Sequence, residues 1–328
     1  MRDSKKSESP LFRTLVPCVE SKEKIFPNSR LLFIGSCFTQ NIGQKFAERG
    51  INVCLNPFGI VYNPLSIFQQ LSHLVNGKVY QIDELKSHNG LYHTFDHHSA
   101  FSDVNPLNAL NKINREIELG AKSLKECSFL FITLGTAYVY LLKENDLLVA
   151  NCHKYPSNYF KKQLLEVTSI VSEFGNLWER IKEFNPNLKV VFSVSPIRHL
   201  ADGFIENNIS KSTLLLAISK IIESYEGCCY FPAYEIVMDE LRDYRFYADD
   251  MIHPNEVAVD YIWRRVKESF LDSSAIQMIS EVEKLKRDLS HRPFNPESEE
   301  FKKFFEEVKC RIALFKSRYS ECNIFFDK

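Results

Sequence analysis

The sequence predicts a three-layer α/β domain built around a five-stranded parallel sheet. Two observations lead to this prediction. Short apolar runs alternate along the chain with segments of helical periodicity, and most of these runs carry the β-branched or aromatic residues typical of strands covered on both faces. The five predicted strands are residues 31–34, 51–55, 129–134, 190–194 and 228–231.

Apolar residues at helical spacing predict helices between these strands over residues 38–46, 107–117 and 170–184, and a further helix over 259–270 after the last strand. Residues 63–106 show little periodicity, so we expect a long loop insertion that is functional or partly disordered. Beyond the last of these helices, two more periodic segments separated by Pro293 and Pro296 predict a helical hairpin. We therefore divide the chain into an α/β domain over 1–270 and a helical extension over 271–328. The extension is expected to pack on the core or on a second copy of the chain.

The composition argues against several classes of partner. With 41 basic and 42 acidic residues the net charge is -1, which provides no global field to attract nucleic acid or an anionic membrane. No segment approaches the roughly 20 apolar residues that span a bilayer, and the N-terminus lacks a secretory pattern. Nine cysteines without a CxxC pair suit a reducing compartment. We therefore expect a cytoplasmic protein.

Two short motifs have the residue types needed for nucleophilic catalysis. Gly35-Ser36-Cys37 follows the first strand, where ligands bind in parallel α/β sheets and where a helix N-terminus lowers a thiol pKa. Near the other end, Asp250 precedes His253 by three residues in the loop before a helix. In that position the carboxylate can bond the imidazole and leave its other nitrogen as a general base.

These two motifs resemble those of a known family. Gly35-Ser36-Cys37-Phe38-Thr39 is similar to the motif that names the GSCFA family, which is assigned to the SGNH (GDSL-like) hydrolases, and the segment 250–255 resembles the Asp/His block of that superfamily. The likeness covers roughly residues 10–270. It implies a flavodoxin-like sheet, acyl or ester transfer, and no cofactor. The resemblance also implies that Gly59 supplies one oxyanion-hole donor.

Two departures from the superfamily pattern leave alternatives open. The third position of the first block is Cys37, whereas a one-residue shift of the turn makes Ser36 the nucleophile; turn geometry and thiolate reactivity favour Cys37. Ala137 stands where the superfamily has the oxyanion-hole Asn, so another donor must replace it. The candidates are Thr136 and Asn151.

Further polar residues are candidates for substrate contacts. Arg198 and His199 follow the fourth predicted strand; Arg198 can hold a carboxylate or phosphate, or can form a loop ion pair. His153 lies in the loop of Asn151 and is a third substrate-binding candidate. The histidines at 88, 93, 97 and 98 invite comparison with a metal site, but they lie on the irregular insertion without regular ligand spacing. We expect them to form a lid or substrate wall, and no metal.

The leading hypothesis is an acyl-ester hydrolase or acyltransferase acting on a small-molecule or carbohydrate ester. The missing block-three Asn supports a second hypothesis, a catalytically weakened binding protein for a carbohydrate or acylated ligand. A nucleotide- or flavin-binding domain is a third, which the lack of a glycine-rich loop after the first strand disfavours. Association of two chains through the C-terminal helices is also expected to be possible.

Overall fold

The computed structural model describes residues 13–17, 20–292, 294–295, 298–322, 324 and 326. It contains the predicted five-stranded parallel sheet, in the order β10-β9-β5-β1-β2. Counted along the chain, these five strands run 2-1-3-4-5, which is the flavodoxin-like order. The predicted fold class is confirmed, and each predicted strand agrees with the structure to within one residue. The strands are β1 (Arg30–Gly35), β2 (Asn52–Leu55), β5 (Phe129–Leu134), β9 (Lys189–Val194) and β10 (Cys228–Tyr230).

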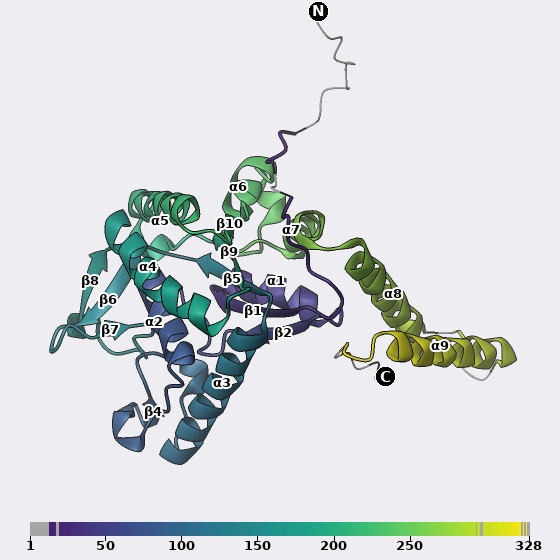
Figure 1. Ribbon diagram of the computed structural model, residues 1–328, viewed down its shortest axis with the longest axis horizontal. Coiled ribbons are helices and arrows are strands. Elements are labelled where there is room, and N and C mark those ends of the chain that lie inside the picture. Colours follow the sequence, from purple (N-terminus) through teal and green to yellow (C-terminus); the bar gives the residue numbers. More distant parts are fainter. Residues whose placement is uncertain are drawn as a thin grey trace, which may run out of the picture.

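Alternate residues of each strand enter two separate cores, as the period of a strand requires. On β1, Leu32 and Ile34 join one core, whereas Leu31 and Phe33 join the other. The first core lies under α2 (Pro64–Val75), α3 (Pro106–Glu126), α4 (Val167–Phe184) and α5 (Phe204–Ser224). The second lies under α1 (Cys37–Ala47), α7 (Glu256–Phe270), α8 (Ser273–Ser290) and α9 (Glu299–Arg318), and Figure 1 shows the three layers.

The C-terminal helical hairpin is present as α8 and α9, which lie to one side of the sheet in Figure 1. Met278 and Val282 of α8 and Phe315 of α9 join the core under α1 and α7. Arg49, just after α1, bonds Glu283 of α8 at 2.6 Å. Pro293 and Pro296, which were expected to separate the helices, lie outside the described residues. Within the part of the chain that the structure describes, no helix is long and apolar enough to cross a membrane.

The prediction of an irregular insertion over 63–106 is wrong for its first part, which forms α2. Asn63 caps this helix by accepting the Ser66 N–H at 2.8 Å, and Pro64 occupies the first helical position. Ile67 and Leu71 then lie on its buried face. The low periodicity of the whole segment hides this helix, although Asn63 followed by Pro64 is a typical helix start.

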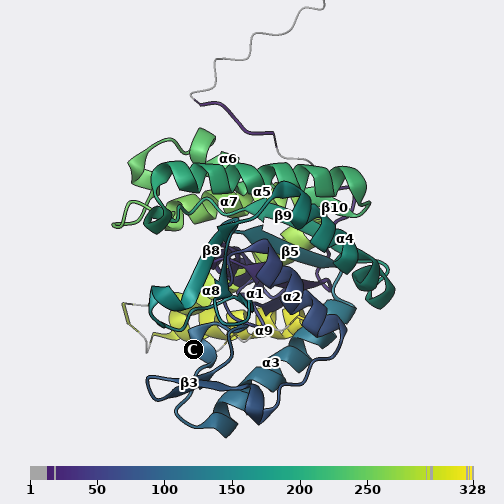
Figure 2. The ribbon, with the colours of Figure 1, turned by 90° about the vertical axis from the view of Figure 1, so that its left-hand side faces the viewer.

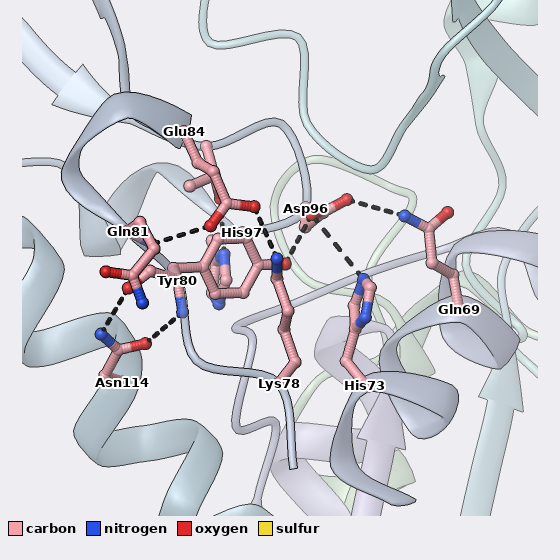
Figure 3. Close-up of polar contacts among 10 residues, drawn as sticks. Gln69, His73, Lys78, Tyr80, Gln81, Glu84, Asp96, His97 and Asn114 are labelled. Atoms are coloured by element: carbon pink, nitrogen blue, oxygen red, sulfur yellow. Dashed lines mark hydrogen bonds and ion pairs between the residues drawn. The ribbon is translucent and has the colours of Figure 1, made fainter. Parts of the chain in front are cut away.

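The rest of the insertion is held together by a buried polar network (Figure 3). Asp96 accepts hydrogen bonds from Tyr80 Oη at 2.5 Å and from Gln69 Nε2 at 3.1 Å. His97 is fully buried, its Nδ1 lies 2.6 Å from Thr94 Oγ1, and its ring stacks on Phe58. These contacts make the rest of the insertion a well-packed part of the fold. In Figure 2 its β3–β4 hairpin lies with α3 at the end of the molecule opposite α5. The hairpin strands are β3 (Lys86–His88) and β4 (Leu91–His93).

A second small sheet was not predicted. It is antiparallel, follows β5 and has the order β7-β6-β8, with strands β6 (Tyr138–Leu142), β7 (Leu148–Val149) and β8 (Phe160–Leu164). The remaining elements are single turns: η1 (Ile82–Glu84), η2 (Ser99–Phe101), η3 (Ser157–Tyr159), η4 (Leu200–Asp202), α6 (Ala233–Glu235), η5 (Ile236–Glu240) and η6 (Tyr244–Phe246).

The buried His97 predicts an acid-sensitive fold. Burial lowers its pKa from 6.5 to about 3, so between these values the unfolded chain binds a proton that the folded chain does not. The free energy of unfolding should therefore fall as the pH drops below 6.5. For this one group the expected slope is about 1.4 kcal/mol per pH unit. Urea titrations of the wild type and His97→Gln from pH 7 to pH 4 measure the difference in slope.

The matched control is His291→Gln, because it makes the same substitution at an exposed histidine. An equal loss of slope in both variants, or an unchanged slope in His97→Gln, would show that the burial of His97 is not responsible.

Candidate active site

The turn between β1 and α1 holds the Gly35-Ser36-Cys37 motif. Gly35 ends β1, Ser36 occupies the N-cap position of α1 without a side-chain capping bond, and Cys37 is the first residue of the helix. Gly35 has a φ of +143°, and a Cβ atom there would lie 2.3 Å from the Thr133 carbonyl oxygen. Its N–H donates to Asn56 Oδ1 at 2.9 Å. The turn therefore requires glycine, and it brings the thiol to the carboxyl edge of the sheet.

The electrostatic surroundings of Cys37 differ from the prediction. Burial raises the pKa of this half-buried thiol, and it outweighs the N–H groups of Phe38 and Cys37 and the charge of Lys211, all of which lower the pKa. The helix N-terminus thus acts in the predicted direction, but the net shift is upward because desolvation of the thiolate is the larger effect. A base or a cation nearby is needed to ionise this thiol.

Ser36 has a different environment from Cys37. Its side chain is 1% exposed, and Ser36 Oγ has no hydrogen-bond partner. A nucleophile of this kind depends on a base within hydrogen-bond reach, and among the described residues neither the Ser36 hydroxyl nor the Cys37 thiol has one.

Asp250 and His253 form the expected pair. Asp250 Oδ2 lies 2.6 Å from His253 Nδ1, while Oδ1 accepts the N–H groups of Ile252 and His253 at 2.9 Å each. The His253 N–H is the largest of the effects that lower the pKa of Asp250 to about 2. Met251 has a φ of +59°, which lets the loop turn back on itself. The carboxylate fixes a proton on Nδ1 and leaves Nε2 of His253 to accept one.

No hydrogen bond joins His253 to Cys37 or Ser36 among the described residues. His253 and Asp250 are about half exposed, at 49% and 47% of their side chains. The charges of Lys211 and His253 both act on His199, so these two side chains lie near the same imidazole ring. The catalytic candidates therefore lie at the same edge of the sheet without direct contact.

The predicted oxyanion-hole groups already have hydrogen-bond partners. The Gly59 N–H donates to the Asn56 carbonyl at 2.7 Å, and the Thr136 N–H donates to the Tyr62 carbonyl at 3.1 Å. Thr136 Oγ1 lies 3.0 Å from Ser210 Oγ. Neither residue offers a free donor in this arrangement, so both roles stay predictions that require rearrangement.

Asn151 and His153 contact the insertion. Asn151 Oδ1 accepts the His153 N–H at 2.8 Å, His153 Nε2 lies 2.8 Å from the Thr94 carbonyl, and its ring stacks on His93. Burial lowers the pKa of His153 to about 4. No described contact connects either residue with Cys37 or His253.

Arg198 and Asp250 line one cavity of about 460 Å³. Arg198 donates to Asn208 Oδ1 at 2.6 Å, and within the described residues it forms no ion pair, in contrast to the loop ion pair considered above. Aromatic and other apolar side chains make up much of the remaining wall; they include Leu200, Phe204, Met238, Tyr244, Tyr247 and Met251. The cavity thus combines a cation with aromatic rings beside the Asp250–His253 pair.

His199 lies on the other side of Arg198, against the Tyr62 ring at 5.0 Å between ring centroids. Burial lowers its pKa to about 4, so the imidazole is neutral at physiological pH.

Lys211 was missed by the sequence analysis. It is 1% exposed on α5, and its Nζ donates to the carbonyl oxygens of Gly135 at 2.6 Å and Ser195 at 2.7 Å. The only signal in the sequence was a lysine among the apolar residues of that helix, which is also the pattern of an ordinary amphipathic helix.

Of the four histidines at 88, 93, 97 and 98, three lie in ring stacks, whereas His98 Nδ1 accepts the Ala100 N–H at 3.2 Å. His88 stacks on Tyr155, His93 on His153 and His97 on Phe58. In the part of the chain described, no group of three or more His, Cys, Asp or Glu side chains is arranged to hold a metal ion.

Sequence comparison places the chain among known proteins. The profile of the GSCFA family matches residues 30–266, which is most of the chain. The chain belongs to the GSCFA family. A second profile, the C-terminal domain of GSCFA domain proteins, matches residues 282–325 of this GSCFA chain, from within α8 onward. No curated protein sequence matches it.

Two solved structures are similar to the GSCFA chain at low identity. A family 3 carbohydrate esterase from Clostridium thermocellum has a TM-score of 0.33 and 8% identity, over 77% of this chain and 98% of the esterase chain. The acetyl xylan esterase Est2A from the rumen bacterium Butyrivibrio proteoclasticus has a TM-score of 0.37 and 12% identity, over 74% and 64% of the two chains.

The close approach of Gly35 to β5 predicts a large effect of a single methyl group. Gly35→Ala places Cβ 2.3 Å from the Thr133 carbonyl oxygen, so the strand or the turn of the GSCFA motif must shift. Gly77→Ala is the matched control, because Gly77 also has a positive φ, +62°, but no atom within 4 Å of the added Cβ. We expect Gly35→Ala to lower the free energy of unfolding by about 2 kcal/mol more than Gly77→Ala. Urea denaturation measures both, and equal losses would contradict the steric argument.

Proposed function

We propose that the chain is an acyl-ester hydrolase or acyltransferase in which Cys37 is the nucleophile, His253 the general base and Asp250 the residue that orients His253. The observation that carries this proposal is the 2.6 Å contact between Asp250 and His253 Nδ1, which leaves Nε2 free. Asp250 shares a cavity with Arg198, which follows β9, and Cys37 begins α1 directly after β1. This common edge of the sheet supports pairing His253 as base with Cys37 as nucleophile.

In the proposed reaction His253 Nε2 takes the proton of the Cys37 thiol, and the sulfur attacks the ester carbonyl carbon. The tetrahedral intermediate collapses to a thioester, and the alcohol leaves with the proton from His253. Water or a second alcohol then attacks the thioester, His253 takes its proton, and the thiol is restored. Water as acceptor gives a carboxylic acid, whereas an alcohol gives a new ester.

The proposed substrate is an ester of a carbohydrate or another small molecule that occupies the cavity beside Asp250. Tyr244, Tyr247 and Phe204 provide aromatic faces there, and Arg198 provides a cation with no carboxylate partner among the described residues. A sugar ring packs on such faces, and an acidic group on the substrate suits the guanidinium.

A binding protein with weakened catalysis is the second candidate. Ala137 provides no oxyanion donor, and the N–H groups of Gly59 and Thr136 are already bonded, which favours this alternative. A thiol-directed probe that labels Cys37 no faster in the wild type than in His253→Ala would support it.

The proposed roles predict a selective loss of activity on short acyl esters. We expect Cys37→Ala and His253→Ala to lower kcat/KM by at least about 100-fold, because each removes the nucleophile or its base. Ser36→Ala should stay within a few-fold of the wild type, since Ser36 Oγ has no partner. Cys310→Ala, at an exposed cysteine, is the control for general effects of cysteine removal.

Activity that survives in Cys37→Ala but not in Ser36→Ala would assign the nucleophile to Ser36. Full activity in His253→Ala would refute the proposed base.

A further inference from the structure

Lys211 is buried without a carboxylate. The side chain is 1% exposed in the middle of α5, and among the described residues no Asp or Glu pairs with it. Lysine is almost never fully buried unless it is paired, because desolvation of an ammonium group is costly. Some other group must therefore account for a lysine at this position.

The two acceptors of Lys211 define its place. Gly135 directly follows β5 and Ser195 directly follows β9, and Nζ bonds both carbonyl oxygens, at 2.6 Å and 2.7 Å. The ammonium thus lies at the carboxyl ends of two neighbouring strands, at the edge where Cys37 begins α1. Among the described side chains, Lys211 is the one whose charge lowers the pKa of Cys37.

The count of hydrogen-bond donors distinguishes the two protonation states of Lys211. An ammonium group has three N–H donors, and the two carbonyls use two of them. No third acceptor is present among the described residues. A neutral amine is satisfied by the two carbonyls, whereas the ammonium needs one more acceptor, preferably an anion.

The neutral and charged states also lie close in energy. The pKa of Lys211 is lowered to about 7, mainly by burial and also by the charge of Arg198, and the Cys37 thiolate acts in the opposite direction. Ionisation of the thiol and protonation of the amine therefore favour each other.

We propose that Lys211 is a positioning residue whose ammonium charge, held by the Gly135 and Ser195 carbonyls, stabilises the thiolate of Cys37. This inference rests on the proposed function only in taking Cys37 as the nucleophile. Lys211 acts through Cys37 and opposes the desolvation that disfavours its anion. It provides the cation that this half-buried thiol requires.

Other titratable groups face the same edge and must be considered in any pH profile. Each interacts with Cys37, Lys211 or His199, and they lie in the loop before α2, in β8, after β9 and in the loop before α7: Tyr62, Lys162, Arg198, Asp202 and His253. Site-specific modification of Cys37 isolates its ionisation from theirs.

The test is the pH dependence of Cys37 alkylation by iodoacetamide, followed peptide by peptide with mass spectrometry, because only the thiolate reacts. In Lys211→Met we expect the midpoint to rise by about 0.5 to 1 pH unit, which lowers the rate at pH 7 by about three- to ten-fold. Lys211→Arg keeps the charge, so its midpoint should not exceed that of the wild type. Lys220→Met, at an exposed lysine of the same helix, and Cys310 as an internal reference should show no shift.

A purely structural lysine gives a different result. Loss of its two hydrogen bonds would lower the melting temperature of Lys211→Met but leave the alkylation midpoint of Cys37 at the wild-type value, and that outcome overturns the proposal. If Lys211→Met does not fold, Lys211→Arg decides, since a midpoint above that of the wild type is incompatible with stabilisation by charge. Esterase activity in Cys37→Ala would refute the proposed function and leave the alkylation result for Lys211 readable.

Discussion

The contact between Gly35 and the neighbouring strand determines how the rest of the site is arranged. The chain leaves β1 with no space for a side chain, because the Thr133 carbonyl of β5 occupies the position of a Cβ atom. Asn56, at the end of β2, holds the Gly35 N–H from the other side. Strands on both sides thus fix the turn; Ser36 is then fully buried, and Cys37 is the first residue after the turn whose side chain is partly exposed. The chemistry of the site depends on this constraint of backbone packing.

Burial of Cys37 at this position destabilises its thiolate. A thiol at a helix N-terminus is usually thought of as acidic, but the N–H groups at the start of α1 do not compensate for burial here. Desolvation acts on the whole thiolate charge, whereas each N–H contributes only a partial charge. A full positive charge near the sulfur would stabilise the thiolate more than these partial charges do. In agreement with this, Lys211 of α5 is buried at the same edge of the sheet. The cost of burying Lys211 and that of burying the thiolate offset each other.

The sequence was sufficient for the sheet because its strands are covered on both faces. A run such as residues 129–134 must be apolar throughout, and that signal is local. The motifs of Cys37 and His253 were also local. By contrast, the role of Lys211 depends on two carbonyl groups more than ten residues away, and the sequence holds no trace of that contact. The net direction of the Cys37 pKa was mispredicted for the same reason, since burial is a property of the fold.

The lack of a hydrogen bond between His253 and Cys37 agrees with the exposure of the two side chains to solvent. The Asp250–His253 pair is internally complete, with one hydrogen bond between Asp250 and the ring and two with backbone N–H groups of the loop, yet about half of each side chain faces solvent. A base in water gains little from a neutral thiol that is half-buried, so nothing in the free protein draws the two together. A substrate in the cavity of Arg198 and Asp250 would exclude water from His253 and strengthen its attraction for the thiol proton. In the proposed mechanism the hydrogen bond between His253 and Cys37 forms only when a ligand binds, because catalytic hydrogen bonds often tighten only in the complex.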